Sequence, residues 1–228
     1  MASTHIPDSG RFPYYERHLP HQHPEGFPLF FTWNLKGAVP ARLIVAVKKE
    51  CLRLQKEPLR PNESLTDRKI RHGKLLFVFQ DRRLDVATDG PLHLKDPAAA
   101  RIVVDSILFG APVRYDLYAF VVMGNHVHVL IVPHWEPKEI MQPMKGFTSF
   151  EINKLQEQPG RVFWQDESYD HWARDEEEMH RIIAYIENNP VVAGLCSKPE
   201  EWPWSSASMR ANWPIGKPWV RPASSRSA

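Results

Sequence analysis

The stretch "AFVVMGNHVHVLIVP" (residues 119–133) decides the fold, because it reads as two apolar β-strands joined by a short turn. Gly124 and Asn125 separate the two runs, and both residue types tolerate the positive φ found in two-residue hairpin turns. The stretch therefore predicts an antiparallel hairpin. It also places His126 and His128 among apolar residues, where an imidazole is costly to bury without a partner.

Segments of strand and helix character surround this hairpin. "PLFFTWNLKG" (28–37) predicts a strand ended by Gly37, and "ARLIVAVKKECLRLQKE" (41–57) predicts a helix. The apolar run at 72–81 fits a short strand or a helix equally well, because periodicity does not separate the two. "RVFWQ" (161–165) fits a strand or a packed loop.

Capping residues delimit the later helices. Asp96 and Pro97 predict a helix over 97–109, and Asp175 with Glu178 predicts a helix over 176–189 that ends before Pro190. A further helix contains "IMQPMKGFTSFEINKLQ", where we expect Pro143 and Gly146 to mark its start. Helices between groups of strands, one group an antiparallel hairpin, predict the α+β class: one antiparallel sheet with helices packed on a face, in ferredoxin-like order.

Length and composition favour one globular domain. The chain has 228 residues, 43% hydrophobic and 25% charged, which is ordinary for a folded protein. We divide it into an irregular arm (1–28), a domain (29–208) with a basic insertion at about 41–95, and a tail (209–228). With no apolar leader and no bilayer-length apolar run, we expect a cytoplasmic protein without membrane partners. Cys51 and Cys196 are expected to be core thiols.

Charge is unevenly distributed along the chain. The net charge is only +2, but between Arg42 and Lys74 ten Lys and Arg side chains face four Asp and Glu, a local excess of +6 (10 − 4). Such a run fits a solvated helix face or a track for phosphates.

His126 and His128 emerge on the same face of their strand, because side chains alternate, and they can converge on one ion. Two hydrogen-bonded histidines at the sheet edge are the structural alternative. On the helix at 176–189, Tyr185 and Asn189 lie one turn apart beside the apolar stripe, facing the sheet; a rim tyrosine and a capping asparagine are the alternative there. A second pair, His21 and His23, lies in a Pro-rich segment with no strand to fix it.

These residues carry a family resemblance. "GNHVHVLIV" is similar to the HUH motif (His, bulky apolar, His), and "FWQDESYDHWARDEEEMHRIIAYIENNPVVAGLCSKPEEWPWSSA" closely resembles the C-terminal half of the REP-associated tyrosine transposases, bacterial relatives of the single-tyrosine insertion-sequence transposases. The resemblance covers roughly residues 14–208 and implies an RRM-like HUH nuclease fold. It implies cleavage and rejoining of single-stranded DNA at the foot of repetitive extragenic palindromic (REP) hairpins, in a bacterial, nucleoid-associated setting.

The resemblance also implies site residues and a cofactor. His126 and His128 match the metal-binding histidines, Asn189 the third ligand and Tyr185 the nucleophile, with Mg²⁺ or Mn²⁺ as the metal. Cleavage leaves a 5′-phosphotyrosine and a 3′ hydroxyl, so that rejoining needs no ATP. Tyr169 in "ESYDHWARD" is the rival nucleophile. It is less favoured, because no regular element is expected to fix its direction and the resemblance places the nucleophile at Tyr185.

Other residues are candidates for DNA contact, and the rival functions stay open. Lys145 and Ser149 are candidates for phosphates, with Thr148 beside them; His171 and Arg174, with Trp164, Tyr169 and Trp172, form a structural or base-stacking cluster. Alternatives to the transposase are a domesticated DNA-hairpin-binding protein without turnover and a metal-dependent hydrolase, for which the strand offers no water-activating carboxylate. A monomer and a homodimer are both compatible with the sequence.

Overall fold

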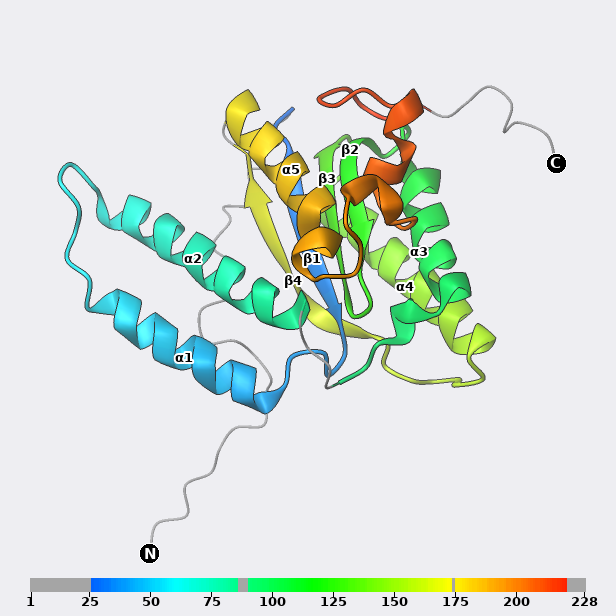
Figure 1. The fold of residues 1–228 in the computed structure, drawn as a ribbon, viewed down its shortest axis with the longest axis horizontal. Coiled ribbons are helices and arrows are strands. Elements are labelled where there is room, and N and C mark those ends of the chain that lie inside the picture. The colour runs from blue at the N-terminus through cyan, green and yellow to red at the C-terminus, as the bar shows by residue number, and fades with distance from the viewer. Residues whose placement is uncertain (1–25, 86–89, 174, 221–228) are drawn as a thin grey trace, which may run out of the picture.

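A four-stranded antiparallel sheet forms the centre of the computed structural model, which describes residues 26–85, 90–173 and 175–220. The strands, in the spatial order β2-β3-β1-β4, are drawn in Figure 1. Their bounds are β1 (Leu29–Leu35), β2 (Tyr115–Val122), β3 (His126–Pro133) and β4 (Trp164–Trp172). Every neighbouring pair is antiparallel. This order is that of a ferredoxin-like split βαβ fold, so the predicted α+β class is confirmed.

Helices cover both faces of the sheet. α3 (Pro97–Gly110) and α4 (Pro137–Leu155) pack on one face, and α5 (Glu176–Val192) lies across the other (Figure 1). α1 (Ala41–Gln55) and α2 (Leu65–Asp85) form a helical hairpin inserted after β1, and α2 runs beside α5. Three short 3-10 helices complete the described part: η1 (His93–Lys95), η2 (Pro199–Glu201) and η3 (Ser206–Asn212).

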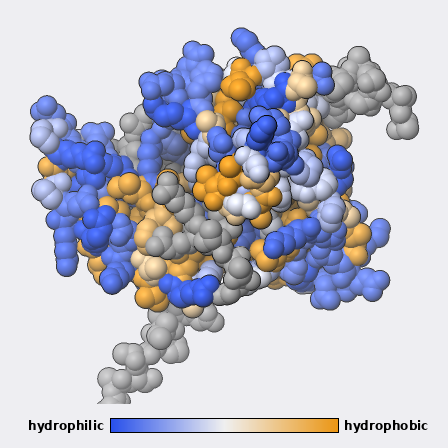
Figure 2. Space-filling view, viewed as in Figure 1, coloured by the Kyte–Doolittle hydropathy of each residue, from blue (hydrophilic) through white to orange (hydrophobic). Residues whose placement is uncertain are grey.

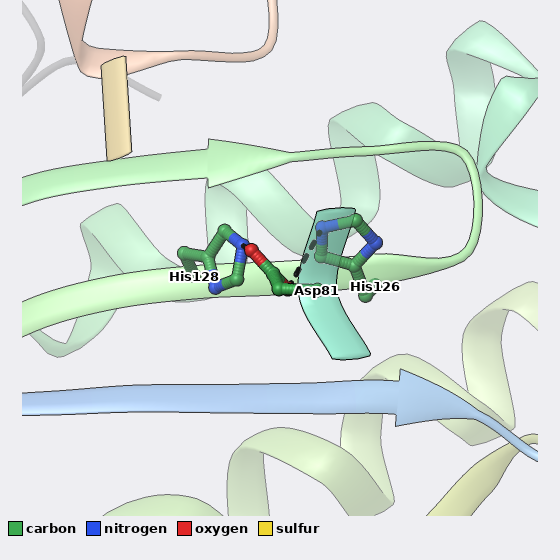
Figure 3. Close-up of side chains that lie close together, drawn as sticks. All are labelled: Asp81, His126 and His128. Carbon is green, nitrogen blue, oxygen red and sulfur yellow. Dashed lines mark ion pairs between the residues drawn. The ribbon is translucent and has the colours of Figure 1, made fainter. Parts of the chain in front are cut away.

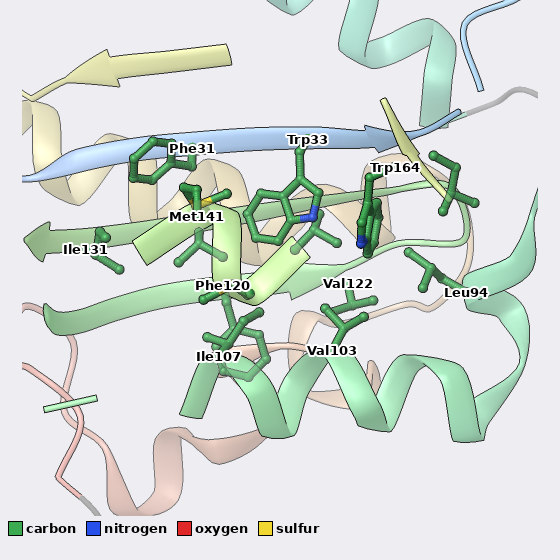
Figure 4. Packing of buried hydrophobic residues seen from close by; sticks show 14 of the residues in the cluster. Phe31, Trp33, Leu94, Val103, Ile107, Phe120, Val122, Ile131, Met141 and Trp164 are labelled. Atoms are coloured by element: carbon green, nitrogen blue, oxygen red, sulfur yellow. The ribbon is translucent and has the colours of Figure 1, made fainter. Parts of the chain in front are cut away.

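The alternation of side chains along the strands divides the core into two clusters. On the α3 and α4 side, Phe31 and Trp33 from β1 pack with Phe120 and with Ile107 from α3 (Figure 4). On the α5 side, Phe30 and Leu130 pack with Ile183 and other residues of α5. Trp213 and Trp219 also bury their side chains in the first cluster, at 2% and 6% exposure. The boundaries of arm, domain and tail remain a prediction.

The expected hairpin forms, but its turn has a different geometry from the one predicted. The amide of Met123 donates to the carbonyl of His126 at 2.9 Å, which closes the turn. Neither Gly124 nor Asn125 has positive φ. The tolerance of these residue types for positive φ therefore does not explain why they occur in the turn. Gly124 is instead close to its neighbours, since a Cβ there would lie 3.2 Å from Cγ of Lys95.

The predicted helix caps at Asp96 and Asp175 are confirmed, because each side chain accepts from a backbone amide of the first turn. The predictions for two prolines were wrong. Pro143 lies inside α4, where it is exposed and the carbonyl that loses its donor can bind water. Pro190 lies in the last turn of α5, which continues to Val192.

Several ambiguous segments are resolved by the structure. The run at 72–81 is helical and belongs to α2. Tyr169, expected outside regular structure, lies in β4 with its backbone paired to Thr32. Cys51 is a core thiol as predicted, but Cys196 is only partly buried, so the prediction failed there. Among the described residues, no helix is both long enough and apolar enough to cross a membrane.

Gly110 at the end of α3 supports a test of the packing. A Cβ at this position would meet ring atoms of Tyr115 at 2.6 Å, and Tyr115 is fully buried with its hydroxyl donating to the carbonyl of Ile107 at 2.5 Å. We therefore expect Gly110→Ala to lower the free energy of unfolding by about 1–3 kcal/mol, as overpacking does. Urea denaturation measures this.

Gly146 provides the matched control, because it is an exposed glycine inside α4 with open space around its Cα. Gly146→Ala should raise the free energy of unfolding by about 0.5–1 kcal/mol through helix propensity. Equal effects of the two substitutions would contradict the close approach of α3 to Tyr115.

Candidate functional site

The imidazole pair of β3 lies on the face of the sheet that α5 covers. His126 and His128 are both 0% exposed, and their ring centroids are 4.7 Å apart. Val127 and Val129, which alternate with the histidines along β3, point into the core cluster on the α3 and α4 side. Strand alternation thus places both imidazoles on one surface, as the sequence predicted.

Each imidazole has a partner at Nδ1. Thr32, which faces His128 across the β1–β3 ladder, places Oγ1 2.7 Å from His128 Nδ1. Oδ1 of Asn125 lies 2.7 Å from Nδ1 of His126. Both Nε2 atoms therefore face the space between β3, α2 and α5. Partners of this kind orient histidines that bind metals.

α5 brings Tyr185 and Asn189 to the same space. The Tyr185 ring centroid lies 5.8 Å from that of His128, and Nδ2 of Asn189 lies 3.4 Å from Nε2 of His128. Asn189 is 3% exposed and Tyr185 is half-buried. The expected approach of the tyrosine and the amide to the imidazole pair is therefore observed.

Asp81 from α2 completes the cluster (Figure 3). Its Oδ2 lies 3.2 Å from Nε2 of His128, and its Oδ1 lies 3.9 Å from Nε2 of His126. The hydroxyl of Tyr185 donates to Oδ2 of Asp81. Asp81 is 1% exposed. We name Asp81, His126, His128, Tyr185 and Asn189 the polar cluster.

Sequence reasoning missed Asp81. It ends the apolar run at 72–81, whose helical character the pattern left undecided, and it belongs to an insertion 45 positions before His126 (126 − 81). No motif signals its role, because only the docking of α2 against α5 brings it to the sheet. Its presence also corrects the argument against a hydrolase, since the site does hold a carboxylate, supplied by α2 and not by the strand.

Burial and charge together set the protonation of the polar cluster. Burial acts to raise the pKa of Asp81, but His128 and then His126 outweigh burial and hold the pKa of this carboxyl well below its usual value. Burial, together with the neighbouring His128, lowers the pKa of His126 to about 3. The site thus contains a carboxylate beside a neutral His126, which can offer a lone pair.

The donor atoms suit a divalent ion. One ligand atom each from Asp81, His126 and His128 can be chosen so that all lie within 4.8 Å of one another. Among the described residues, Oδ1 of Asp81 and Oδ1 of Asn189 are buried without a hydrogen-bond partner, although buried oxygens normally have one. Two imidazoles and two oxygens match the preferences of Mn²⁺ and, in oxygen donors, of Mg²⁺.

Aromatic rings close the site against water. Phe30 from β1 and Phe77 from α2 pack edge to face at 5.5 Å, and the Phe77 centroid lies 6.2 Å from His128 and 6.1 Å from Tyr185. An ion pair joins Lys74 of α2 to Glu178 of α5. Glu178 also lies 3.0 Å from Nε2 of His171. These contacts seat α2 on α5 and cover the polar cluster.

The other predicted DNA contacts lie elsewhere. Lys145 and Ser149 are on α4, on the opposite face of the sheet, where Nζ of Lys145 donates to the Gln165 carbonyl at 2.6 Å. His171 is on the site face but is engaged with Glu178. Trp164 is buried and donates to Thr148 at 3.0 Å, so it packs in the core. Arg174, His21 and His23 lie outside the described residues, and the role of these residues in DNA binding remains a prediction.

Part of the chain matches a known protein family. Residues 111–189 match the family model described as "Transposase IS200 like". This segment is an IS200-like transposase domain. It runs from the end of α3 to Asn189 and so contains His126, His128, Tyr185 and Asn189, whereas Asp81 lies outside it. Transposases cut and rejoin DNA, which places the domain among DNA-processing enzymes.

The whole chain has a structural neighbour of low sequence identity. A structure titled "Structure of the REP associates tyrosine transposase bound to a REP hairpin" is 14% identical, with a TM-score of 0.49, and the match covers 88% of this chain and 89% of the other. No protein with a curated function matches the chain.

Thermal stability tests whether the polar cluster binds a metal. Mn²⁺ at 100 times its dissociation constant should stabilise the folded protein by about 2.7 kcal/mol, because it binds only the folded state. We expect differential scanning fluorimetry to show a rise in Tm, and we expect Asp81→Ala and His126→Ala to remove it.

The control is a second Asp–His pair, Asp116 and His134, whose side chains are 3.4 Å apart and partly exposed. Asp116→Ala should keep the Mn²⁺-dependent rise in Tm. Loss of the rise in this variant, or its persistence in both cluster variants, would place the ion away from the polar cluster.

Proposed function

We propose that the protein is a metal-dependent endonuclease and strand transferase that acts on single-stranded DNA at REP-type hairpins, with Tyr185 as the nucleophile. The observation that carries the proposal is the convergence of a tyrosine hydroxyl, two imidazoles and an amide of the transposase domain with a carboxylate from α2. The REP-type hairpin is the substrate that the sequence resemblance implies.

His126, His128, Asp81 and Asn189 would hold the ion, either Mg²⁺ or Mn²⁺. A divalent ion supplies polarisation of a phosphodiester oxygen and stabilises the charge that develops on the phosphoryl group. The apolar wall of Phe30 and Phe77 strengthens these electrostatic effects by excluding water.

The proposed reaction is a transesterification. The phenolic oxygen of Tyr185 forms a bond to phosphorus, and the bond from phosphorus to the 3′ oxygen breaks. The proton that Tyr185 loses is balanced by the one that the departing 3′ oxygen gains. A 3′ hydroxyl that attacks the 5′-phosphotyrosine reverses the step, so that rejoining consumes no ATP.

Asp81 is suited to orient the nucleophile. It accepts the hydrogen bond from Tyr185 and contacts His128 and Asn189 through the same oxygen. Because the pKa of Asp81 is held below its usual value, this carboxylate holds the hydroxyl in place and does not keep its proton. Such fixed alignment of nucleophile and ligands is a large part of phosphoryl-transfer catalysis.

The nucleophile is tested by Tyr185→Phe. Removal of the hydroxyl should abolish the covalent protein–DNA adduct formed with a labelled hairpin oligonucleotide and Mn²⁺, while hairpin affinity changes by less than about twofold. Denaturing gels and mass spectrometry measure the adduct, and a gel-shift assay measures binding.

Tyr118→Phe is the matched control, because Tyr118 is another half-buried tyrosine packed against the same apolar cluster. It should form the adduct at the wild-type level. An adduct that persists in Tyr185→Phe would move the role to another residue, with Tyr169 the first to test.

A metal-dependent hydrolase is the second candidate, and the carboxylate of Asp81 favours it. In that case the products would be free 5′-phosphate and 3′-hydroxyl ends with no adduct. A protein that binds the hairpin without turnover would give neither product. One incubation thus separates the three functions.

The α1–α2 hairpin carries the candidate track for phosphates. Its surface is hydrophilic at the end far from the sheet and carries hydrophobic areas nearer to it (Figure 2). Arg53 and Arg71 are engaged with glutamates of the same hairpin. Lys48 and Lys49 are exposed on α1, and Lys56 is exposed at its C-cap. We propose that these lysines contact the DNA backbone next to the site.

Salt dependence tests this track. Each lost phosphate contact lowers the slope of log K against log salt by about 0.7–0.9, so the triple substitution Lys48→Gln, Lys49→Gln and Lys56→Gln should lower it by about 2–3. Fluorescence anisotropy with a hairpin oligonucleotide measures the slope. Lys138→Gln with Lys154→Gln, exposed on α4 across the sheet, should leave it unchanged; equal effects of both sets would contradict a local track.

A further inference from the structure

Asn125 is not explained by the turn in which it lies. Its φ is negative, so the turn does not need the left-handed backbone that asparagine tolerates. It is nonetheless 3% exposed, and a buried amide side chain requires hydrogen bonds at both ends. The reason for an asparagine must therefore lie in its side-chain contacts.

Both ends of this amide are engaged. Nδ2 of Asn125 donates to the carbonyl of Leu84 at 3.1 Å, and Oδ1 lies 2.7 Å from Nδ1 of His126. The Leu84 carbonyl can only accept, so the amide nitrogen must face it and the amide oxygen must face the imidazole. An amide oxygen can only accept, so Nδ1 of His126 must donate.

This arrangement fixes the tautomer of the neutral His126 imidazole. With the proton on Nδ1, the lone pair lies on Nε2, the nitrogen that faces Asp81. The same contact holds the end of α2, because Leu84 is three residues after Asp81, one turn along the helix. Asn125 therefore links the histidine of β3 to the helix that carries the carboxylate.

The backbone of the turn is held too. The carbonyl of Asn125 accepts from the amide of Leu35 at 2.8 Å, and the carbonyl of Gly124 accepts from the amide of Leu94 at 3.2 Å. The side chain of Asn125 is thus presented from a backbone fixed to β1 and to η1. The backbone of the turn cannot move away without breaking these bonds.

We propose that Asn125 is a positioning residue of the metal site, which sets the Nδ1–H tautomer of His126 and joins it to the last turn of α2 next to Asp81. The proposal rests on the proposed function in so far as a metal binds at the polar cluster. The tautomer itself is a property of the metal-free protein.

The first test is ¹⁵N NMR of the metal-free full-length protein with labelled histidine, with the His126 signals identified by their loss in His126→Gln. We expect a protonated Nδ1 and an unprotonated Nε2 in the wild type, and a mixture of tautomers in Asn125→Ala. An Nε2–H tautomer in the wild type would overturn the proposal.

The second test is Mn²⁺ affinity by isothermal titration calorimetry. Loss of a partner that orients a ligand lowers metal affinity by about 10–100-fold, and we expect this for Asn125→Ala. Asn125→Asp keeps an acceptor for Nδ1–H and should retain more affinity than Asn125→Ala, even though it loses the donor to Leu84.

Asn153 supplies the matched control. It is also buried, donates to the Arg161 carbonyl at 2.7 Å and accepts from Nε of Arg161 at 2.9 Å, on α4 across the sheet. Asn153→Ala should lower Tm without changing Mn²⁺ affinity or the tautomer of His126. Wild-type Mn²⁺ affinity in Asn125→Ala would overturn the positioning role alone, whereas a wild-type protein that binds no Mn²⁺ would overturn the metal site and the proposed function with it.

Discussion

The approach of the Asp81 carboxylate to the imidazole pair is the constraint on which the site depends. A carboxylate at 1% exposure beside two imidazoles at 0% exposure costs several kcal/mol of desolvation unless the groups compensate one another. Here they do so across three elements, since α2 supplies the charge, β3 the imidazoles and α5 the hydrogen bonds of Tyr185 and Asn189. The docking of the inserted helix and the assembly of the site are thus one event.

The contacts that hold α2 against the sheet also cover the polar cluster. The polar cluster lies beneath α2, Phe77 and the ion pair of Lys74 with Glu178, and the proposed function requires a DNA phosphate to reach it. The contacts between α2 and α5 are largely polar, beside the rings of Phe77 and Tyr185. Polar contacts are replaced by water at lower cost than apolar contacts are. The insertion that brings Asp81 to the site therefore also covers it.

Much of the fold follows from periodicity. The alternation in "HVHVLIVP" predicts that both histidines share a face, and the 100° spacing in α5 predicts that Tyr185 and Asn189 share a flank; the structure brings the four together. The caps at Asp96 and Asp175 were predictable because an N-cap is a local interaction. Pro143 and Pro190 were not, because whether a helix continues past a proline depends on the surroundings of the carbonyl that loses its donor.

Asp81 and Asn125 show where pattern reasoning ends. Asp81 acts through a contact with a helix about a hundred positions later, and no local spacing records such a contact. Asn125 was assigned to the turn for its backbone, whereas the structure employs its side chain. In both cases the residue type was compatible with a common local role. Only the tertiary packing revealed the contacts that these side chains make at the site.

The most direct measurement of the central claim is a crystal structure of the Mn²⁺-soaked full-length protein, with anomalous scattering recorded at the manganese edge. The account predicts one strong anomalous peak at about 2.0–2.3 Å from Nε2 of both His126 and His128 and from a carboxylate oxygen of Asp81. A peak at another site, or clear density for the polar cluster with Asp81 turned away from both imidazoles, would contradict it.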